Sequence, residues 1–216
     1  MNDLLIQIAD NFKTKEIAFS ILREIKSGKE ATVYSVLLDG KLLAMKVYQA
    51  DFLQKQAAKY SEGKFYQLKS EARSVFKKNK VGRKLRESNW VKREFYLMQK
   101  LFKLGANVPE PVEILENAIF MSFIGDDKTP APRLSDLKLS KPEAELIYTQ
   151  IQKNLEIFKN IGIAHGDLSP YNILFFADQI WIIDFPQAVD LATHPDGQKY
   201  LDKDLEIIQK WYERVR

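Results

Sequence analysis

The chain has 216 residues, of which 45% are hydrophobic and none is cysteine. This composition is typical of a globular protein with one sizeable core or two smaller lobes, and the lack of cysteine excludes disulfides and thiolate metal sites. No apolar run is long enough for a membrane-spanning helix, and the N-terminus does not resemble a signal peptide. We therefore expect a cytoplasmic protein without a membrane partner.

The net charge of +4 conceals a local excess of basic residues. Residues 50–90 hold eleven Lys or Arg against four Asp or Glu, whereas the rest of the chain is slightly acidic. Such a segment is typical of a contact with RNA or another anionic surface, and equally of a solvated charged loop. Both interpretations are open from the composition.

The chain begins with a predicted helix. Leu5, Ile8 and Phe12 recur at helical spacing, which indicates a short helix within residues 1–20. A β-rich stretch follows, because the dipeptide at 39–40, Asp-Gly, is a strong hairpin signal between two apolar runs.

The second of these apolar runs is expected to be a strand that carries Lys46. Residues 50–88 are polar and weakly patterned, so we expect a flexible or partly helical insertion there. A helix is predicted over 89–104, with Gly105 as its stop. Its apolar positions are spaced four, three and four apart: Val91, Phe95, Met98 and Phe102.

The remainder is predicted to be mainly helical. Residues 118–125 indicate a buried strand that leads into a connector, and the turn-rich stretch DDKTPAPRL after it marks a domain boundary. Ser140 and Glu143 have the spacing of a capping box at the start of a helix. The buried face of that helix is expected to hold Ile147, Ile151, Leu155 and Phe158. Two short strands follow, and a last helix is indicated by Leu201, Leu205, Ile208 and Trp211.

This order of elements predicts an α+β protein of two lobes. Residues 1–20 form an N-terminal helical segment, residues 21–124 a β-rich N-lobe with the basic insertion, and residues 125–216 a mainly helical C-lobe. Because ligands usually bind at domain junctions, we expect the binding cleft between the lobes.

Two short motifs in the C-lobe carry the chemistry. HGDLSPYNILF covers 165–175 and IIDFPQ covers 182–187, and a turn between their strands brings Asp184 back toward the first motif. Asn172 and Asp184 offer the hard oxygen ligands that Mg²⁺ prefers. Asp167 then stays available to accept a proton from an attacking hydroxyl, which is the division of roles that phosphoryl transfer needs.

Two further residues fit the same chemistry. Lys46 on its strand is suited to clamp phosphates, and Glu94 on the following helix is suited to hold that lysine. The segment SGKEATVY, residues 27–34, could cover phosphates with backbone N–H groups near Gly28.

Together the motifs SGKEATVY, AMKVY, WVKREF, FMSFIGDDKTPAP, HGDLSPYN and IIDFPQ resemble the RIO family of atypical serine/threonine protein kinases. The resemblance runs from about residue 21 to the last residue. It implies a trimmed protein-kinase-like fold with the ATP cleft between the lobes, and the short stretch after Asp184 agrees with the trimming. WVKREF and FIGDD are similar to the first RIO subfamily, whereas IDFPQ is similar to the second.

The resemblance also implies roles for particular residues. Asp167 corresponds to the catalytic aspartate, and Asn172 and Asp184 to the ligands of Mg²⁺, or alternatively Mn²⁺. Lys46 would bind phosphate and pair with Glu94. The remaining ATP contacts would come from the loop with Ser27, Gly28 and Lys29 and from the connector with Ser122 and Ile124.

The implied activity is that of an ATP-dependent kinase or ATPase that phosphorylates itself. Asp184 is the candidate for a phospho-aspartate, and the candidate autophosphorylated serines are Ser61, Ser70, Ser74 and Ser88. Family membership further implies a role in maturation of the small ribosomal subunit, with residues 50–90 as the contact to ribosomal RNA or a pre-ribosomal particle. The protein substrate does not follow from the sequence.

Two other functions are compatible with parts of the sequence. Aminoglycoside and choline kinases share HGDL, a downstream Asn and an IDF-like aspartate, but they need a large helical region for their substrate, for which few residues remain here. The basic segment supports a nucleotide-gated RNA-binding module with negligible turnover, and its RNA affinity would fall steeply with salt.

Overall fold

The computed structural model describes residues 3–54 and 80–216, and in the second range it describes side chains from Trp90 onward. The chain divides into two compact units. The first unit comprises Met1–Phe95 and Glu110–Phe123, and the second comprises Tyr96–Pro109 and Ile124–Arg216. Helix α4 (Lys80–Lys103) therefore contributes residues to both units.

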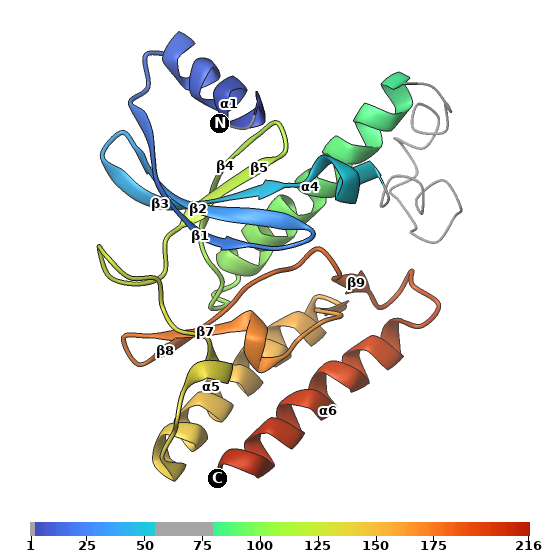
Figure 1. Cartoon of the computed structure of the whole chain (residues 1–216). Helices are drawn as coiled ribbons and strands as arrows, with labels where there is room; N and C mark the ends of the chain where they lie inside the picture. Colours follow the sequence, from blue (N-terminus) through green and yellow to red (C-terminus); the bar gives the residue numbers. More distant parts are fainter. Residues whose placement is uncertain (1–2, 55–79) are drawn as a thin grey trace. The chain divides into compact units, whose positions relative to one another are not determined.

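The first unit is built on an antiparallel sheet of five strands in the order β1-β2-β3-β5-β4 (Figure 1). The strands are β1 (Phe19–Ser27), β2 (Ala31–Leu38), β3 (Lys41–Tyr48), β4 (Pro111–Leu115) and β5 (Ala118–Ser122). Asp39 and Gly40 both have positive φ, as a two-residue hairpin turn requires, and they set Leu38 opposite Lys41. The predicted hairpin is confirmed.

Helix α1 (Asp3–Thr14) covers one face of this sheet. Its apolar stripe of Leu5, Ile8 and Phe12 is buried, as predicted, and the Phe12 ring meets the Phe120 ring edge-on at 5.4 Å. Met45 and Val47 of β3 belong to the same core. Because side chains alternate along a strand, Lys46 and Tyr48 face the opposite side of the sheet.

Helix α4 starts at Lys80, well before the residue 89 expected from the sequence. Its first turns hold good helix formers such as Lys, Arg and Leu but lack an apolar stripe, so periodicity gave no signal for them. Val91, Phe95 and Met98 are buried as predicted, whereas Phe102 is 39% exposed, and Leu101 takes its place in the core.

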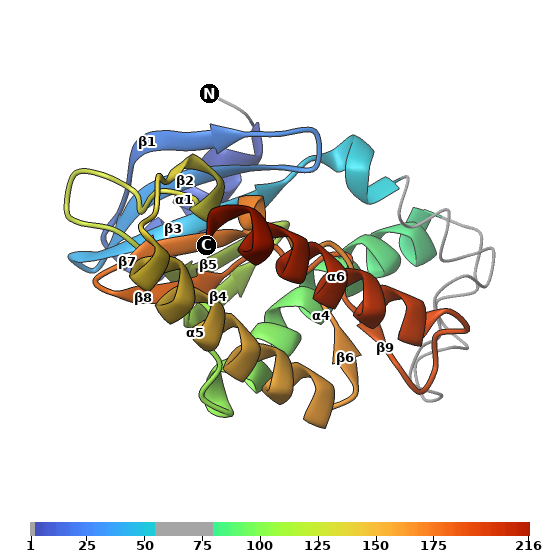
Figure 2. The ribbon, with the colours of Figure 1, turned by 90° about the horizontal axis from the view of Figure 1, so that it is seen from below.

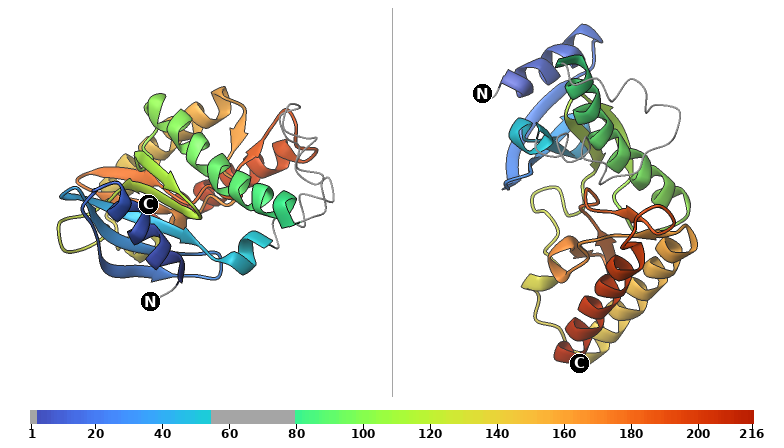
Figure 3. Two further views of the ribbon diagram at one scale, coloured as in Figure 1. Left: turned by 90° about the horizontal axis from the view of Figure 1, so that it is seen from above. Right: turned by 90° about the vertical axis from the view of Figure 1, so that its right-hand side faces the viewer.

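In the second unit two long helices lie side by side and antiparallel: α5 (Lys141–Asn160) and α6 (Gly197–Val215) (Figures 2 and 3). Tyr148 near the start of α5 stacks on Tyr212 near the end of α6, with ring centroids 4.1 Å apart. The Tyr148 hydroxyl also donates a hydrogen bond to Gln209. These contacts hold α6 against α5.

The short elements of this unit precede α5 in the chain, in the case of η1, or lie between α5 and α6. They are η1 (Leu134–Asp136), β6 (Ile163–Ala164), η2 (Pro170–Asn172), β7 (Ile173–Phe176), β8 (Gln179–Ile182) and β9 (Val189–Asp190). β6 pairs with β9, and β7 with β8. Ala177 and Asp178 both have positive φ and close the β7–β8 hairpin, which returns the chain to the start of β7.

Helix α5 agrees with its prediction. Ser140 and Glu143 form the expected capping box, and the four apolar positions named above are all buried. Asn154 is buried on the same helix. Its Oδ1 accepts a hydrogen bond from the backbone N–H of Asn107 at 2.6 Å, and its Nδ2 donates one to the side-chain oxygen of Asn107 at 3.1 Å. Asn107 in turn accepts a hydrogen bond from the N–H of Ile182.

Helix α6 corrects one detail of the sequence interpretation. Leu205, expected on the apolar stripe, is 37% exposed, whereas the preceding Asp204 is 1% exposed. Residues 201, 204, 208 and 211 share the buried face, so an acid occupies a core position.

The sheet followed by helices confirms the α+β class and agrees with a trimmed kinase-like fold. The ATP cleft expected between the lobes stays a prediction. The expected flexible insertion, with the candidate phosphorylation sites Ser61, Ser70 and Ser74, lies outside the described residues except at its two ends. No helix in the described ranges combines the length and the apolar character needed to cross a bilayer.

Candidate active site

The first motif loop, residues 165–172, carries Asp167 and Asn172. The Asp167 side chain is exposed, whereas Asn172 is only 8% exposed. The amide nitrogen of Asn172 donates to the Asp167 carbonyl oxygen at 2.9 Å and contacts a carboxylate oxygen of Asp167 at 3.3 Å. These bonds orient the amide of Asn172, so that its oxygen is the atom left for a cation.

The second motif loop, residues 183–188, begins directly after β8. The N–H of Ile183 donates to the carbonyl oxygen of Asn172 at 3.0 Å, so the backbone before Asp184 is bonded to the first loop. Asp184 itself has φ of +74°, a conformation that residues other than glycine rarely adopt. Phe185 is buried and anchors the loop. Rare backbone conformations of this kind cluster at functional sites.

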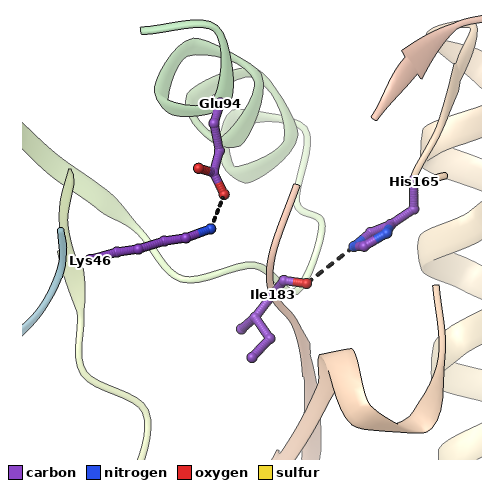
Figure 4. Close-up of polar contacts among 4 residues, drawn as sticks. All are labelled: Lys46, Glu94, His165 and Ile183. Atoms are coloured by element: carbon purple, nitrogen blue, oxygen red, sulfur yellow. Dashed lines mark hydrogen bonds and ion pairs between the residues drawn. The ribbon is translucent and has the colours of Figure 1, made fainter. Parts of the chain in front are cut away.

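His165 connects the two motif loops. Its Nδ1 accepts a hydrogen bond from the N–H of Asp167 at 3.3 Å, and its Nε2 lies 3.1 Å from the carbonyl oxygen of Ile183 (Figure 4). Since a carbonyl oxygen can only accept, the ring is neutral with its proton on Nε2. Complete burial lowers the pKa of His165, and the Asp204, Asp184 and Asp167 carboxylates oppose that effect.

Asp204 is a functional candidate that the sequence interpretation missed. From α6 its two carboxylate oxygens accept hydrogen bonds from the backbone N–H groups of Gly166 at 2.9 Å and Leu168 at 3.0 Å. The bonds flank Asp167 on both sides and fix its backbone. An acid at an apolar-stripe position of a helix was the available signal, because a buried carboxylate needs hydrogen-bond donors.

Gly166 allows the two loops to approach each other closely. It has φ of +83°, and a Cβ at this position would lie 2.3 Å from the carbonyl oxygen of Gln187. No side chain fits in that space. Glycine is therefore required between His165 and Asp167 by both the backbone conformation and the contact.

The donor set of the second unit fits a magnesium-like cation. Among the described residues there is no group of three or more His, Cys, Asp or Glu that could hold a metal. One carboxylate, Asp184, and one amide oxygen, Asn172, are a sparse set of hard ligands. Such a set suits a cation that keeps water and is completed by substrate phosphates, and it does not suit zinc.

In the first unit, Lys46 and Glu94 form the expected pair. The Lys46 ammonium donates to the Glu94 carboxylate at 2.8 Å (Figure 4), and the two side chains are 10% and 2% exposed. The opposite charge compensates the desolvation of each partner, and removal of either one would leave a buried charge. The ion pair fixes the ammonium at the end of a long side chain.

The β1–β2 turn contains Ser27, Gly28 and Lys29. The N–H of Gly28 donates to the carbonyl oxygen of Ala31 at 3.0 Å, so this group closes the turn and is not available to a phosphate. The Ser27 hydroxyl lies 3.1 Å from the Thr32 hydroxyl. Lys29 is exposed at the tip. Phosphate contacts by this turn therefore depend on groups other than the Gly28 N–H.

The connector after β5 holds Ser122 and Ile124. The Ser122 N–H donates to the Glu110 carbonyl oxygen at 2.8 Å, and the Ile124 carbonyl oxygen accepts from the N–H of Ala131 at 2.9 Å. An adenine contact in this segment has to use other backbone groups. The roles assigned to the connector and to the turn stay predictions, as do those of the motif residues.

Comparison with known proteins identifies relatives over most of the chain. Residues 32–216 match the family described as RIO domain. The serine/threonine-protein kinase rio1 of Schizosaccharomyces pombe is 29% identical over 216 residues, which cover 98% of this chain and 41% of that protein. The human serine/threonine-protein kinase RIO1 is 30% identical over 208 residues, covering 93% of this chain and 34% of the relative.

A third relative, the mouse serine/threonine-protein kinase RIO3, is 32% identical over 126 residues, which cover 58% of this chain and 24% of the relative. The chain thus spans between about a quarter and two fifths of the length of these proteins. The matches confirm the resemblance to the RIO family that the motifs indicated.

Proposed function

The chain belongs to the RIO family, and on this premise we propose that it is an ATP-dependent serine/threonine protein kinase that uses a divalent metal ion. The observation that carries the proposal is the contact between Asp167 and Asn172, held beside the loop of Asp184. An exposed carboxylate next to an oriented amide, with a second carboxylate on the loop bonded to them, provides the residue types that phosphoryl transfer needs.

In the proposed reaction a serine or threonine hydroxyl attacks the γ-phosphorus of ATP. The new bond joins the hydroxyl oxygen to phosphorus, the bond from phosphorus to the bridging oxygen breaks, and ADP leaves. The Asp167 carboxylate accepts the hydroxyl proton. Its exposure suits this role, because the hydroxyl arrives on another molecule or segment.

Two sets of residues would hold the nucleotide. Asn172 and Asp184 would bind the metal ion, Mg²⁺ or alternatively Mn²⁺, which neutralises charge on the phosphates. Lys46, held by Glu94, would donate to the phosphates. A substantial part of the catalysis would then come from positioned charge, which needs no covalent step by the protein.

A variant of this reaction uses Asp184 as the acceptor. Transfer of the γ-phosphoryl group to its carboxylate gives an acyl-phosphate, which water then hydrolyses, so that the net reaction is that of an ATPase. The unusual φ of Asp184 is the observation that supports a special role for this side chain. A partner in the maturing small ribosomal subunit follows from the family resemblance alone.

Incubation with γ-labelled ATP and Mg²⁺ tests the proposal. We expect label on the protein, loss of that label in Asp167→Asn, and its retention in Asp178→Asn, a matched change at an exposed hairpin turn. Alkali-labile, hydroxylamine-stable label indicates phosphoserine or phosphothreonine, whereas hydroxylamine-labile label that is lost in Asp184→Ala indicates the acyl-phosphate. Equal labelling of Asp167→Asn and wild type would contradict the proposal. Transfer to small alcohols or aminosugars alone would favour a small-molecule kinase.

A further inference from the structure

The ammonium of Lys46 has a second neighbour besides Glu94. Its Nζ lies 4.9 Å from the centroid of the Tyr48 ring, within the range of a cation–π contact. Lys46 and Tyr48 are two residues apart on β3, so their side chains extend from the same face of the sheet. Tyr48 is only 1% exposed, and burial strengthens such a contact.

The Tyr48 ring is itself held by two further aromatic side chains. It stacks on Phe52 with ring centroids 6.0 Å apart and an interplanar angle of 15°. Phe52 meets Trp90 edge-on at 6.2 Å and 77°. Trp90 lies one helical turn before Glu94 on α4, and both are buried. Lys46 thus contacts Tyr48, which is connected through Phe52 to Trp90 of α4, and the same helix carries Glu94, the ion-pair partner of Lys46.

A ring face suits this place better than a second acid would. Fixing a lysine side chain costs about 2 kcal/mol of rotamer entropy, so a contact that adds to the ion pair with Glu94 helps to hold the ammonium in one position. A second carboxylate would hold the ammonium but would also repel an incoming phosphate. The face of an aromatic ring attracts the cation without bringing a net negative charge, so the ammonium keeps its attraction for phosphate.

The Tyr48 hydroxyl makes no hydrogen bond within the part of the chain that the structure describes, although it is buried. A buried hydroxyl without a partner costs free energy and contributes nothing to holding Lys46. The ring, and not the hydroxyl, is therefore the functional part of this side chain. This separates Tyr48→Phe, which keeps the ring, from Tyr48→Leu, which removes it.

We propose that Tyr48 is a positioning residue, whose ring face, braced by Phe52 and Trp90, holds the Lys46 ammonium in place for ATP phosphates. The inference rests on the proposed function of Lys46 as the phosphate-binding lysine. It adds a second restraint on that lysine to the pair with Glu94. It also gives a reason for an aromatic side chain at this position of β3.

The test measures the affinity for a non-hydrolysable ATP analogue with Mg²⁺ by calorimetry in the full chain. We expect Tyr48→Leu to weaken binding about fivefold, which corresponds to a cation–π contact of about 1 kcal/mol. Tyr48→Phe should bind within twofold of wild type. In a Lys46→Met background, Tyr48→Leu should have no further effect on binding. Tyr34→Leu is the matched control, because it removes a tyrosine that packs against the core on the α1 side of the sheet.

Stability measurements separate the inference from the proposed function. If Lys46→Met leaves nucleotide affinity unchanged, the proposed function of Lys46 is wrong. A double-mutant cycle of Lys46→Met and Tyr48→Leu in urea unfolding still reports whether the two side chains are coupled. Tyr48→Met serves in both assays if Tyr48→Leu does not fold. Additive effects of Lys46→Met and Tyr48→Leu on both nucleotide binding and urea unfolding would overturn the positioning role. Equal binding by Tyr48→Leu and Tyr48→Phe would also overturn it.

Discussion

His165 donates its Nε2–H to the carbonyl oxygen of Ile183 at 3.1 Å, and this bond joins the loop of Asp167 to the loop of Asp184. The ring also packs on Phe185, with centroids 4.8 Å apart. A neutral, fully buried imidazole thus fixes the relative place of two carboxylates that the proposed reaction needs. The relationship has consequences for both stability and pH dependence.

Replacement of His165 by Phe keeps a ring against Phe185 but leaves two buried backbone groups without their partner. The free energy of unfolding should fall by about 2 kcal/mol at neutral pH, in line with the cost of unsatisfied buried polar groups. Urea unfolding measures this change. A loss below about 0.5 kcal/mol would show that the bond to Ile183 contributes little.

The pH dependence of stability should also come from His165. Burial lowers its pKa in the folded state below the ordinary value of about 6.5, so the fold favours the neutral ring. The stabilisation is complete above pH 6.5 and is lost as pH falls toward the folded pKa. The thermal midpoint of wild type should therefore decrease between pH 7 and pH 5, and that of His165→Phe should decrease less. The chain has one other histidine, so His194→Gln is the control and should behave as wild type.

Asp204 should matter for turnover more than for nucleotide binding. Asp204→Asn keeps one acceptor oxygen and loses the other, so one of the N–H groups flanking Asp167 loses its charge-assisted bond. We expect about 2 kcal/mol less stability and a kcat lowered tenfold or more, with ATP affinity within threefold of wild type. Asp202→Asn, on the same helix but exposed, should leave all three quantities unchanged. A weakened affinity with normal kcat would argue against the positioning of Asp167.

The Lys46–Glu94 pair should show the behaviour of a buried ion pair. Lys46→Met leaves the Glu94 carboxylate buried beside an apolar chain, and the free energy of unfolding should fall by about 3–5 kcal/mol. The double variant Lys46→Met/Glu94→Leu should recover much of that loss while it stays inactive. As control, Lys15→Met breaks a half-exposed pair with Glu113 and should cost less than about 1 kcal/mol. Failure of the double variant to recover stability would contradict this account.

Two glycines with similar backbone conformation should respond differently to alanine. Gly166 and Gly162 both have positive φ, but only at Gly166 would a Cβ collide with another backbone, that of Gln187. Gly162→Ala should cost about 1 kcal/mol of stability and retain activity, whereas Gly166→Ala should abolish turnover because the two motif loops are forced apart. Comparable activity of the two variants would mean that the loops tolerate the displacement.

Local patterns predicted the elements that depend on neighbours in the sequence. The capping box of Ser140 and Glu143, the apolar face of α5 and the turn at Asp39 and Gly40 are all present, because each is decided within a few residues. The motifs are also short, and their order along the chain predicted the family. The start of α4 was missed, since its first turns carry no apolar stripe.

Contacts between distant segments could not be predicted in this way. Periodicity placed Leu205 on the buried face of α6, but the structure buries Asp204, because two backbone N–H groups some forty residues earlier in the chain need acceptors. The position of the proton on His165 likewise depends on Ile183. The aromatic side chains near Lys46 include Phe52 and Trp90, of which Trp90 comes from a distant part of the chain. The sequence by itself determined which residues carry the proposed chemistry. Only the tertiary structure decided which buried groups hold them, since hydrogen bonding and burial are properties of segments that meet after folding.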